Sequence, residues 1–310
     1  MEFWKDKTVL VTGGSGFLGS HLVEKLKEKN AKVFTSKSSE NDLTKMDCVL
    51  ELFEKVKPDY VFHASADVGG IGYNRVSPAD IFRNNVLMAV NVLEACRLNK
   101  VKKLINIGSA CAYPGEVDGL MSEDNFLDGA MHESVEVYGF SKRSLYLGGK
   151  AYLKQYGLNS IFLILTNLYG ERDKFDPKES HVVAALIKKF VDAKRNNEAF
   201  VQCWGTGNPV REFMYAQDCA ESIIKLAEVY NKQEPVNIGV GQGTSIKELA
   251  ELLKKVTKYE GEIVWETSMP DGAMYKVLNI EKLKKLTGIN EFTSLEKGLE
   301  LTIDWYMKNN

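Results

Sequence analysis

Short apolar runs alternate with longer, helix-like segments through the first half of the chain. The strand-like runs lie at 9–12, 32–36, 60–64, 103–108 and 160–165, and the helix-like segments between them at 20–29, 44–56, 78–98 and 138–156. Continuous apolar strands separated by helices are typical of a parallel sheet with helices on both faces. We therefore predict an α/β, doubly wound parallel sheet. Thr44 and Asp47 predict a capping box at the start of the second helix.

The alternation breaks after residue 165. Residues 167–180 have loop composition, and the later elements are predicted at 180–193 (helix), 201–204 (strand), 205–209 (turn), 218–230 (helix) and 236–239 (strand). Helix and short strand then mix at 245–257, 262–266, 280–287 and 294–308. We expect one domain of 1–165 plus about 216–240, and a smaller interleaved mixed α/β domain of 166–215 plus 241–310.

A glycine-rich turn follows the first strand, in the segment TVLVTGGSGFLG. Gly13, Gly16 and Gly19 have the spacing G-x-x-G-x-x-G and precede an amphipathic helix. Such glycines permit a tight turn, the approach of a pyrophosphate, and close packing of helix on strand. A plain glycine-rich turn is the alternative, but this context favours a Rossmann-type dinucleotide site. The predicted cofactor contacts here are Gly13, Gly14, Ser15, Gly16, Phe17, Leu18 and Gly19.

Composition narrows the class of protein. The net charge of −2 gives no electrostatic signature of a nucleic-acid or membrane partner. Five cysteines without a C-x-x-C pair favour a reducing compartment over a disulfide framework, and no metal-ligand cluster is visible. No apolar run reaches membrane-spanning length and no signal peptide is expected, so we predict a cytoplasmic protein.

Tyr138 and Lys142 form a Y-x-x-x-K pair on a predicted helix, where residues four apart share a face. A cationic lysine beside a phenol is expected to lower the tyrosine pKa, which suits proton exchange with a carbonyl oxygen. Ser109 follows the fourth strand and can bind the same oxygen. A solvated Tyr/Lys pair is the alternative reading. The glycine turn, the serine and this pair, in that order, resemble the extended short-chain dehydrogenase/reductase superfamily, whose chemistry is hydride transfer.

Longer segments resemble the GDP-L-fucose synthase family over nearly the whole chain. They are HASADVGGIGYNR (63–75), GSACAYP (108–114), TNLYGERDKFDPKESHVVAALIKKF (166–190), WGTGNPVREFMY (204–215) and the PDG turn (270–272). The resemblance implies an NADP(H)-dependent 3,5-epimerase and 4-reductase acting on GDP-4-keto-6-deoxy-mannose. It also implies a dinucleotide in the first domain, a nucleotide sugar in the second, and a homodimer packed through helices 78–98 and 138–156.

The same resemblance implies roles for individual residues. Cys111 would be the base and His181 the acid that invert carbons beside the ketone; a buried structural cysteine and a helix-start histidine are the alternatives. Lys189, where the family more often has arginine, would bind the nucleotide sugar with Trp204, Arg211 and Asp271. Further cofactor contacts are implied at Ser36, Lys37, Ser38, Tyr138, Lys142, Leu165, Thr166, Asn167, Leu168 and His181.

The end of the second strand bears on the choice of cofactor. An enzyme that uses NAD usually carries an acidic residue there for the ribose 2′-hydroxyl. Here the segment 35–39 reads TSKSS, and Glu40 comes slightly late. Lys37 and the hydroxyls favour a 2′-phosphate and hence NADP(H), unless Lys37 is only a solvated loop lysine.

The sequence departs from the family at 273–279, AMYKVLN, where a proline, an arginine and an aspartate are replaced, and in VVAAL after His181. Three interpretations therefore stay open. The first is GDP-L-fucose synthesis. The second is reduction of another GDP-4-keto sugar, a deoxyhexose or heptose, with reduced or lost epimerisation. The third is a non-catalytic dinucleotide sensor, against which the intact Ser109, Tyr138 and Lys142 argue.

Overall fold

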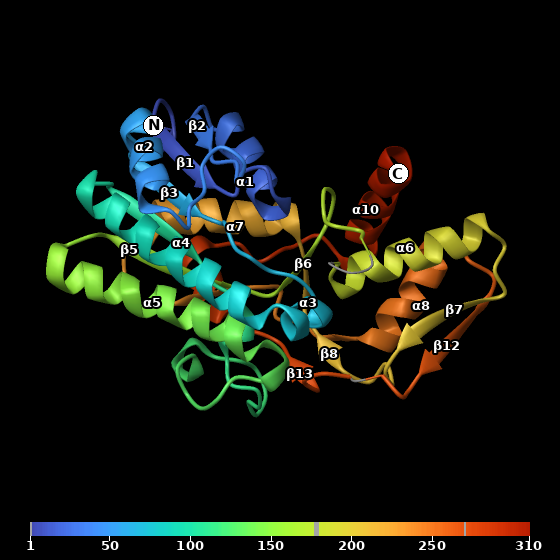
Figure 1. The fold of residues 1–310 in the computed structure, drawn as a ribbon. Coiled ribbons are helices and arrows are strands. Elements are labelled where there is room, and N and C mark those ends of the chain that lie inside the picture. Colours follow the sequence, from blue (N-terminus) through green and yellow to red (C-terminus); the bar gives the residue numbers. More distant parts are fainter. Residues whose placement is uncertain (1, 177–179, 270) are drawn as a thin grey trace.

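A six-stranded parallel sheet forms the centre of the computed structural model, which describes residues 2–176, 180–269 and 271–310 (Figure 1). Its strands lie in the order β10-β5-β4-β3-β1-β2. They are β1 (Thr8–Thr12), β2 (Lys32–Thr35), β3 (Tyr60–His63), β4 (Lys103–Ile107), β5 (Ser160–Leu165) and β10 (Val236–Ile238). The predicted doubly wound parallel sheet is confirmed.

Helices cover both faces of this sheet (Figure 1). On one face α4 (Pro78–Leu98) packs against both α2 (Met46–Val56) and α5 (Glu136–Tyr156). On the other face α1 (Phe17–Glu28) packs against α7 (Ala216–Val229), and α7 contacts α9 (Glu281–Thr287). β4 and β5 are buried at every position, as expected for strands covered on both sides.

A second group of elements lies beside the sheet and has its own apolar cluster (Figure 1). It contains α6 (Val182–Arg195), α8 (Ile246–Thr257), α10 (Leu295–Asn309) and the parallel pair β7 (Phe200–Trp204) and β12 (Glu262–Glu266). Between it and the sheet run β6 (Asn167–Tyr169) with β9 (Phe213–Tyr215), and β8 (Val210–Arg211) with β11 (Thr244–Ser245) and β13 (Tyr275–Lys276). The exact domain boundaries stay a prediction.

Two local predictions differ from the structure, and one short helix was missed. Thr44 does not cap α2, because its N–H and hydroxyl both donate to Asp42 Oδ1, an alternative local hydrogen bond. The start of the segment predicted as a loop at 167–180 is instead the strand β6, which pairs with β9. The short helix α3 (Ile71–Val76) was not predicted. A complete capping box does occur, with Ser245 and Glu248, at the start of α8.

In the described part of the chain, no helix has both the length and the apolar character required to cross a lipid bilayer.

Candidate active site

The glycine turn lies at the carboxyl end of β1 and opens directly into α1. Gly13 has φ +69°, a left-handed conformation that favours glycine. A Cβ on Gly19 would lie 2.0 Å from the Gly13 carbonyl oxygen, so α1 approaches the turn as closely as only glycine permits. The α1 N-cap is Gly16, which has no side chain to accept hydrogen bonds from the first helical N–H groups. Ser15 and Gly16 are exposed at the tip of the turn, so those groups are open to an anionic ligand.

The end of β2 lies beside this turn. The Gly13 N–H donates to Ser36 Oγ at 3.3 Å, and Ser36 is buried. Lys37 and Ser38 are exposed, and Lys37 Nζ lies 3.6 Å from Glu40 Oε1. The structure therefore brings the predicted 2′-phosphate residues next to the glycine turn. There the Glu40 carboxylate also pairs with Lys37.

Ser109 and Cys111 share one turn of 3-10 helix, η1 (Ala110–Ala112), just past the end of β4. Ser109 is the N-cap, and its Oγ accepts a hydrogen bond from the Cys111 N–H at 3.2 Å. The α5 helix contacts this turn closely, because a Cβ on Gly139 would lie 2.5 Å from the Cys111 carbonyl oxygen. Cys111 is partly exposed.

Tyr138 and Lys142 lie on the first turns of α5, and both are buried. The nearby Ser109 side chain favours the ionised form of Tyr138, but burial dominates and, with the nearby Cys111, raises the tyrosine pKa. Lys142 Nζ lies 5.7 Å from the centre of the Tyr138 ring and donates to the Ile107 carbonyl oxygen at 3.0 Å. Burial lowers the lysine pKa to about 8.

These directions correct the expected effect of Lys142 on its neighbour. The expectation was a lowered tyrosine pKa, whereas burial, with the nearby Cys111, raises it. Tyr138 is therefore a protonated phenol near neutral pH, and a protonated phenol is the form that donates a proton to a ketone.

A buried His63 lies next to Lys142 and was not singled out from the sequence. Its Nδ1 forms a hydrogen bond of 2.9 Å with Thr12 Oγ1, and the Ser65 N–H also donates to that oxygen. Burial, with the charge of Lys142, lowers the His63 pKa to about 3, so the imidazole is neutral. His63 and Thr12 are paired on adjacent strands, which the sequence signals only as two polar residues ending two apolar runs.

His181 is the N-cap residue of α6 and belongs to the second group of elements. His181 is exposed at the surface, and the protein around it, together with the charge of Lys174, lowers its pKa. The carbonyl oxygen of Ser180 lies 3.0 Å from the position that a Cβ on Gly70 would take. The residue before His181 therefore packs against the loop before α3. Within the described residues no hydrogen bond joins His181 to Ser109, Cys111 or Tyr138.

The predicted sugar-nucleotide residues fall on the second group of elements. Lys189 Nζ donates to the Gln202 carbonyl oxygen at 2.8 Å and lies 5.5 Å from the centre of the Trp204 ring. Trp204 is 63% exposed, an unusual state for an indole. Arg211 lies within electrostatic range of Cys111 and Asp271, although burial lowers its pKa overall.

Asp271 is held by the turn after β7. Its two carboxylate oxygens accept from the Thr206 N–H and the Thr206 hydroxyl, each at 2.7 Å. Both oxygens therefore hold the turn at 205–206, which directly follows Trp204.

The predicted cofactor residues 165–168 run from the end of β5 into β6, and two of them contact Glu212, a residue that the sequence analysis missed. Leu165 and Thr166 are buried, and Asn167 and Leu168 are partly exposed. Thr166 Oγ1 and Asn167 Nδ2 both donate to the backbone carbonyl of Glu212. The Glu212 side chain is fully buried and follows Arg211 directly. Its position inside the apolar segment VREFMY was the available signal.

A nucleotide-binding parallel sheet with serine, tyrosine and lysine at its carboxyl edge defines an oxidoreductase of the short-chain dehydrogenase/reductase type. The chain belongs to the NAD dependent epimerase/dehydratase family, whose sequence model matches residues 9–239.

Individual relatives are similar over almost their whole length. The chain is 39% identical over 306 residues to GDP-L-fucose synthase 1 of Arabidopsis thaliana, covering 98% of this chain and 94% of that protein. Among solved structures it resembles a GDP-6-OMe-4-keto-L-xylo-heptose reductase from C. jejuni, with a TM-score of 0.93, 29% identity and coverage of 98% and 99%. It also resembles an NADP-bound GDP-L-fucose synthetase from Naegleria fowleri, with a TM-score of 0.90, 28% identity and coverage of 98% and 95%.

Proposed function

We propose that this protein is an NADPH-dependent epimerase and reductase that converts a GDP-4-keto-6-deoxy-mannose-type sugar to GDP-L-fucose. The observation that carries the proposal is the meeting of Ser109, Cys111 and Tyr138 at the carboxyl edge of the sheet. A ketone oxygen bound by two hydroxyls, with a thiol beside it, supports both proton removal next to the ketone and reduction of the ketone itself. The similarity to GDP-L-fucose synthases supports the same reaction.

The residues around the glycine turn fit a dinucleotide. Gly13 and Gly19 let the turn and α1 pack closely, and α1 offers its first N–H groups to the pyrophosphate. Lys37, with Ser36 and Ser38, would hold the 2′-phosphate, which distinguishes NADP(H) from NAD(H). When bound, the cofactor supplies a hydride to C4 of the sugar.

Epimerisation requires a base and an acid on opposite faces of the sugar. Cys111, as thiolate, removes a proton from the carbon beside the ketone, and the electron pair of that C–H bond moves to the ketone oxygen as an enolate. Ser109 and the protonated Tyr138 stabilise this charge by hydrogen bonds. His181 returns a proton to the opposite face. Its lowered pKa makes the imidazolium a stronger donor, although a smaller fraction is present at neutral pH.

Reduction uses Tyr138 and Lys142 from the same group of residues. As C4 gains a hydride, its oxygen gains charge and takes the phenolic proton of Tyr138. Lys142 lies on the same face of α5, one turn further on, and its positive charge offsets the charge left on the tyrosine.

The nucleotide end of the sugar would lie over the second group of elements. Arg211 can bind a diphosphate through two parallel hydrogen bonds, and the exposed indole of Trp204 can stack on a base. Lys189 adds positive charge beside that indole. Asp271 holds the adjoining turn through Thr206.

A second candidate is a C4 reductase of another GDP-4-keto sugar, with reduced or lost epimerisation. The altered segment 273–279 favours it, because β13 (Tyr275–Lys276) pairs with the strand that carries Arg211. The similarity to a GDP-heptose reductase favours it too.

Deuterium incorporation separates the two candidates. The protein is incubated in deuterated buffer with NADPH and a panel of GDP-4-keto sugars, and NMR assigns the product stereochemistry and the deuterium at C3 and C5. The epimerase predicts deuterium at inverted centres in the wild type. In Cys111→Ser this deuterium should be lost while C4 is still reduced. Reduction without any exchange in the wild type would favour the dedicated reductase.

The cellular location that we propose is the cytoplasm. All five cysteines are free thiols in the structure, and the proposed base is one of them. A reducing compartment keeps such thiols active.

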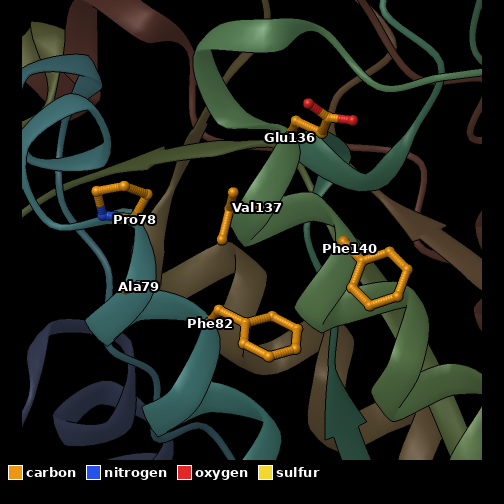
Figure 2. A pocket seen from close by; sticks show the side chains of 6 residues that line it. All are labelled: Pro78, Ala79, Phe82, Glu136, Val137 and Phe140. Carbon is orange, nitrogen blue, oxygen red and sulfur yellow. The ribbon is translucent and has the colours of Figure 1, made fainter.

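The outer face of α4 and α5 supports a homodimer, the quaternary structure we propose. The depression in Figure 2 is lined by Pro78, Ala79, Phe82, Glu136, Val137 and Phe140. The Phe82 and Phe140 rings lie 6.2 Å apart, and Leu87, Val90 and Leu147 are also exposed on these two helices. A two-fold axis through this face would pack the helices of two copies as a four-helix bundle. Light scattering should give twice the chain mass for the wild type and a monomer for Phe140→Asp, and a monomeric wild type would refute the interface.

A further inference from the structure

Arg143, on α5, is hydrogen-bonded to two other segments near Cys111, the proposed base. Its Nε donates to the Ala112 carbonyl oxygen at 2.7 Å, its Nη1 to the Gly129 carbonyl oxygen at 3.0 Å, and its Nη2 to the Asp128 carbonyl oxygen at 3.2 Å. The first acceptor belongs to η1, the turn that carries Cys111, and the other two to the loop that leads back into α5 (Figure 1). A planar guanidinium fixes such an arrangement better than a flexible ammonium group.

The turn that carries Cys111 depends on α5 for its position. The Cys111 carbonyl oxygen packs against Gly139, where a Cβ would lie 2.5 Å from that oxygen. One helical turn later, Arg143 holds the next residue, the fully buried Ala112. Gly139 and Arg143 are four residues apart and share a face of α5. The turn therefore packs against α5 at Gly139 and is hydrogen-bonded to α5 at Arg143.

The neighbouring reductase residues are held differently. Lys142 donates to the Ile107 carbonyl oxygen on β4, and Tyr138 is buried on the first turns of α5 near Ser109. Neither contact involves Arg143. Removal of the guanidinium therefore releases the Ala112 carbonyl at the end of η1 and the loop at 128–129, while the hydrogen bond from Lys142 to Ile107 does not depend on it.

We infer that Arg143 is a positioning residue that sets the place of the Cys111 thiol relative to the ketone, and thereby the share of substrate that is epimerised before it is reduced. The inference rests on the proposed function of Cys111 as base. Proton removal depends steeply on geometry, and a displacement of about 1 Å can cost on the order of 100-fold in rate.

The test compares Arg143→Met, Arg143→Lys and the control Lys150→Met. Lys150 is exposed on the same helix, and its ammonium, 5.4 Å from the centre of the Tyr146 ring, makes no hydrogen bond or ion pair with the described residues, so its loss removes a cation from α5 without releasing a carbonyl. Each variant reacts with NADPH and the GDP-4-keto sugar in deuterated buffer. The measured quantity is the ratio of deuterium incorporation at C3 and C5 to NADPH oxidation. Circular dichroism verifies that each variant is folded.

Arg143→Met should lower this ratio by roughly 10- to 100-fold and increase the fraction of reduced but uninverted sugar. Arg143→Lys should recover part of the ratio, because an ammonium can still reach one carbonyl. Lys150→Met should match the wild type. An unchanged ratio in Arg143→Met, or an equal loss of both activities, would overturn the inference.

A second readout does not depend on the proposed function. Iodoacetamide labelling followed by mass spectrometry gives the alkylation rate of Cys111 relative to Cys48, the other partly exposed cysteine. Arg143→Met should change this relative rate several-fold, because the thiol moves with its turn. If the wild type exchanges no deuterium, the proposed epimerase fails, yet the labelling still decides whether Arg143 positions Cys111. An unchanged labelling ratio then overturns the inference.

Discussion

Glu212 offers the sharpest test of how the site is held together. Its fully buried carboxylate accepts hydrogen bonds from three backbone N–H groups, with Oε1 bound to Val240 and Gly241 and Oε2 bound to Leu278 at 2.8 Å. The side chain thus joins the strand of Arg211 to the segment after β10 and to the segment after β13. The perturbation is Glu212→Gln, which keeps the shape and changes one acceptor oxygen into an NH₂ group.

The magnitude follows from counting these bonds. The amide oxygen can keep the two N–H groups on the Oε1 side, which leaves an NH₂ group facing the Leu278 N–H. Losing one hydrogen bond to a charged acceptor costs about 1.5–3 kcal/mol, and the unpaired buried donors add about 1–3 kcal/mol. Burial of a neutral amide in place of a carboxylate returns part of this, since desolvation already raises the Glu212 pKa. We expect a net loss of about 2–4 kcal/mol in the free energy of unfolding.

Thermal unfolding measures this loss, with Glu248→Gln as the matched control. Glu248 is exposed and closes the capping box of α8, where glutamine is also accepted. Glu212→Gln should lower the melting temperature by roughly 4–8 °C, at about 2 °C per kcal/mol for a chain of this size. It should also raise the KM for the GDP-sugar more than the KM for NADPH, because Arg211 adjoins Glu212. A melting temperature that falls no further than in Glu248→Gln would refute the reasoning.

Three further predictions concern the cofactor and the reducing group. Tyr138→Phe should lower kcat for reduction by about 10²–10⁴-fold, because only the proton donor is removed, while NADPH binding by fluorescence titration is retained. Lys37→Glu should weaken NADPH by roughly 10–100-fold, about 1–3 kcal/mol, and leave NADH unaffected in the same titration. An unchanged preference would mean that Lys37 does not bind the 2′-phosphate. Because Lys142 has a lowered pKa of about 8, its ammonium form is lost as the pH rises through that value. The kcat/KM for NADPH should therefore fall above pH about 8, and this alkaline limb should be absent in Lys142→Arg.

The parallel sheet could be predicted because its strands are continuous apolar runs whose pattern does not depend on their partners. β6 could not be predicted in this way. Asn167–Tyr169 is short, and it becomes a strand only because β9 lies beside it in the fold. Thr44 shows the opposite error, since a sequence pattern typical of a capping box is satisfied locally by Asp42.

The residues of the site also differ in whether the sequence alone could predict them. Ser109, Tyr138 and Lys142 could be found because their chemistry requires particular side chains at a particular spacing. Arg143 and Glu212 could not, because their partners are backbone carbonyls and N–H groups, which every residue carries. The direction of the Tyr138 pKa was also beyond the sequence, because it depends on how completely α5 and η1 exclude water.

The cap of η1 has a consequence for how this enzyme family can diversify. Ser109 Oγ is held by the backbone N–H of residue 111 and not by its side chain. Any residue other than proline at 111 can supply the same donor. A lineage can therefore exchange the thiol for a different group, and so give up one reaction, without moving the serine on which the other depends. The two chemistries share an anchor, yet a single replacement of the side chain at 111 leaves that anchor in place.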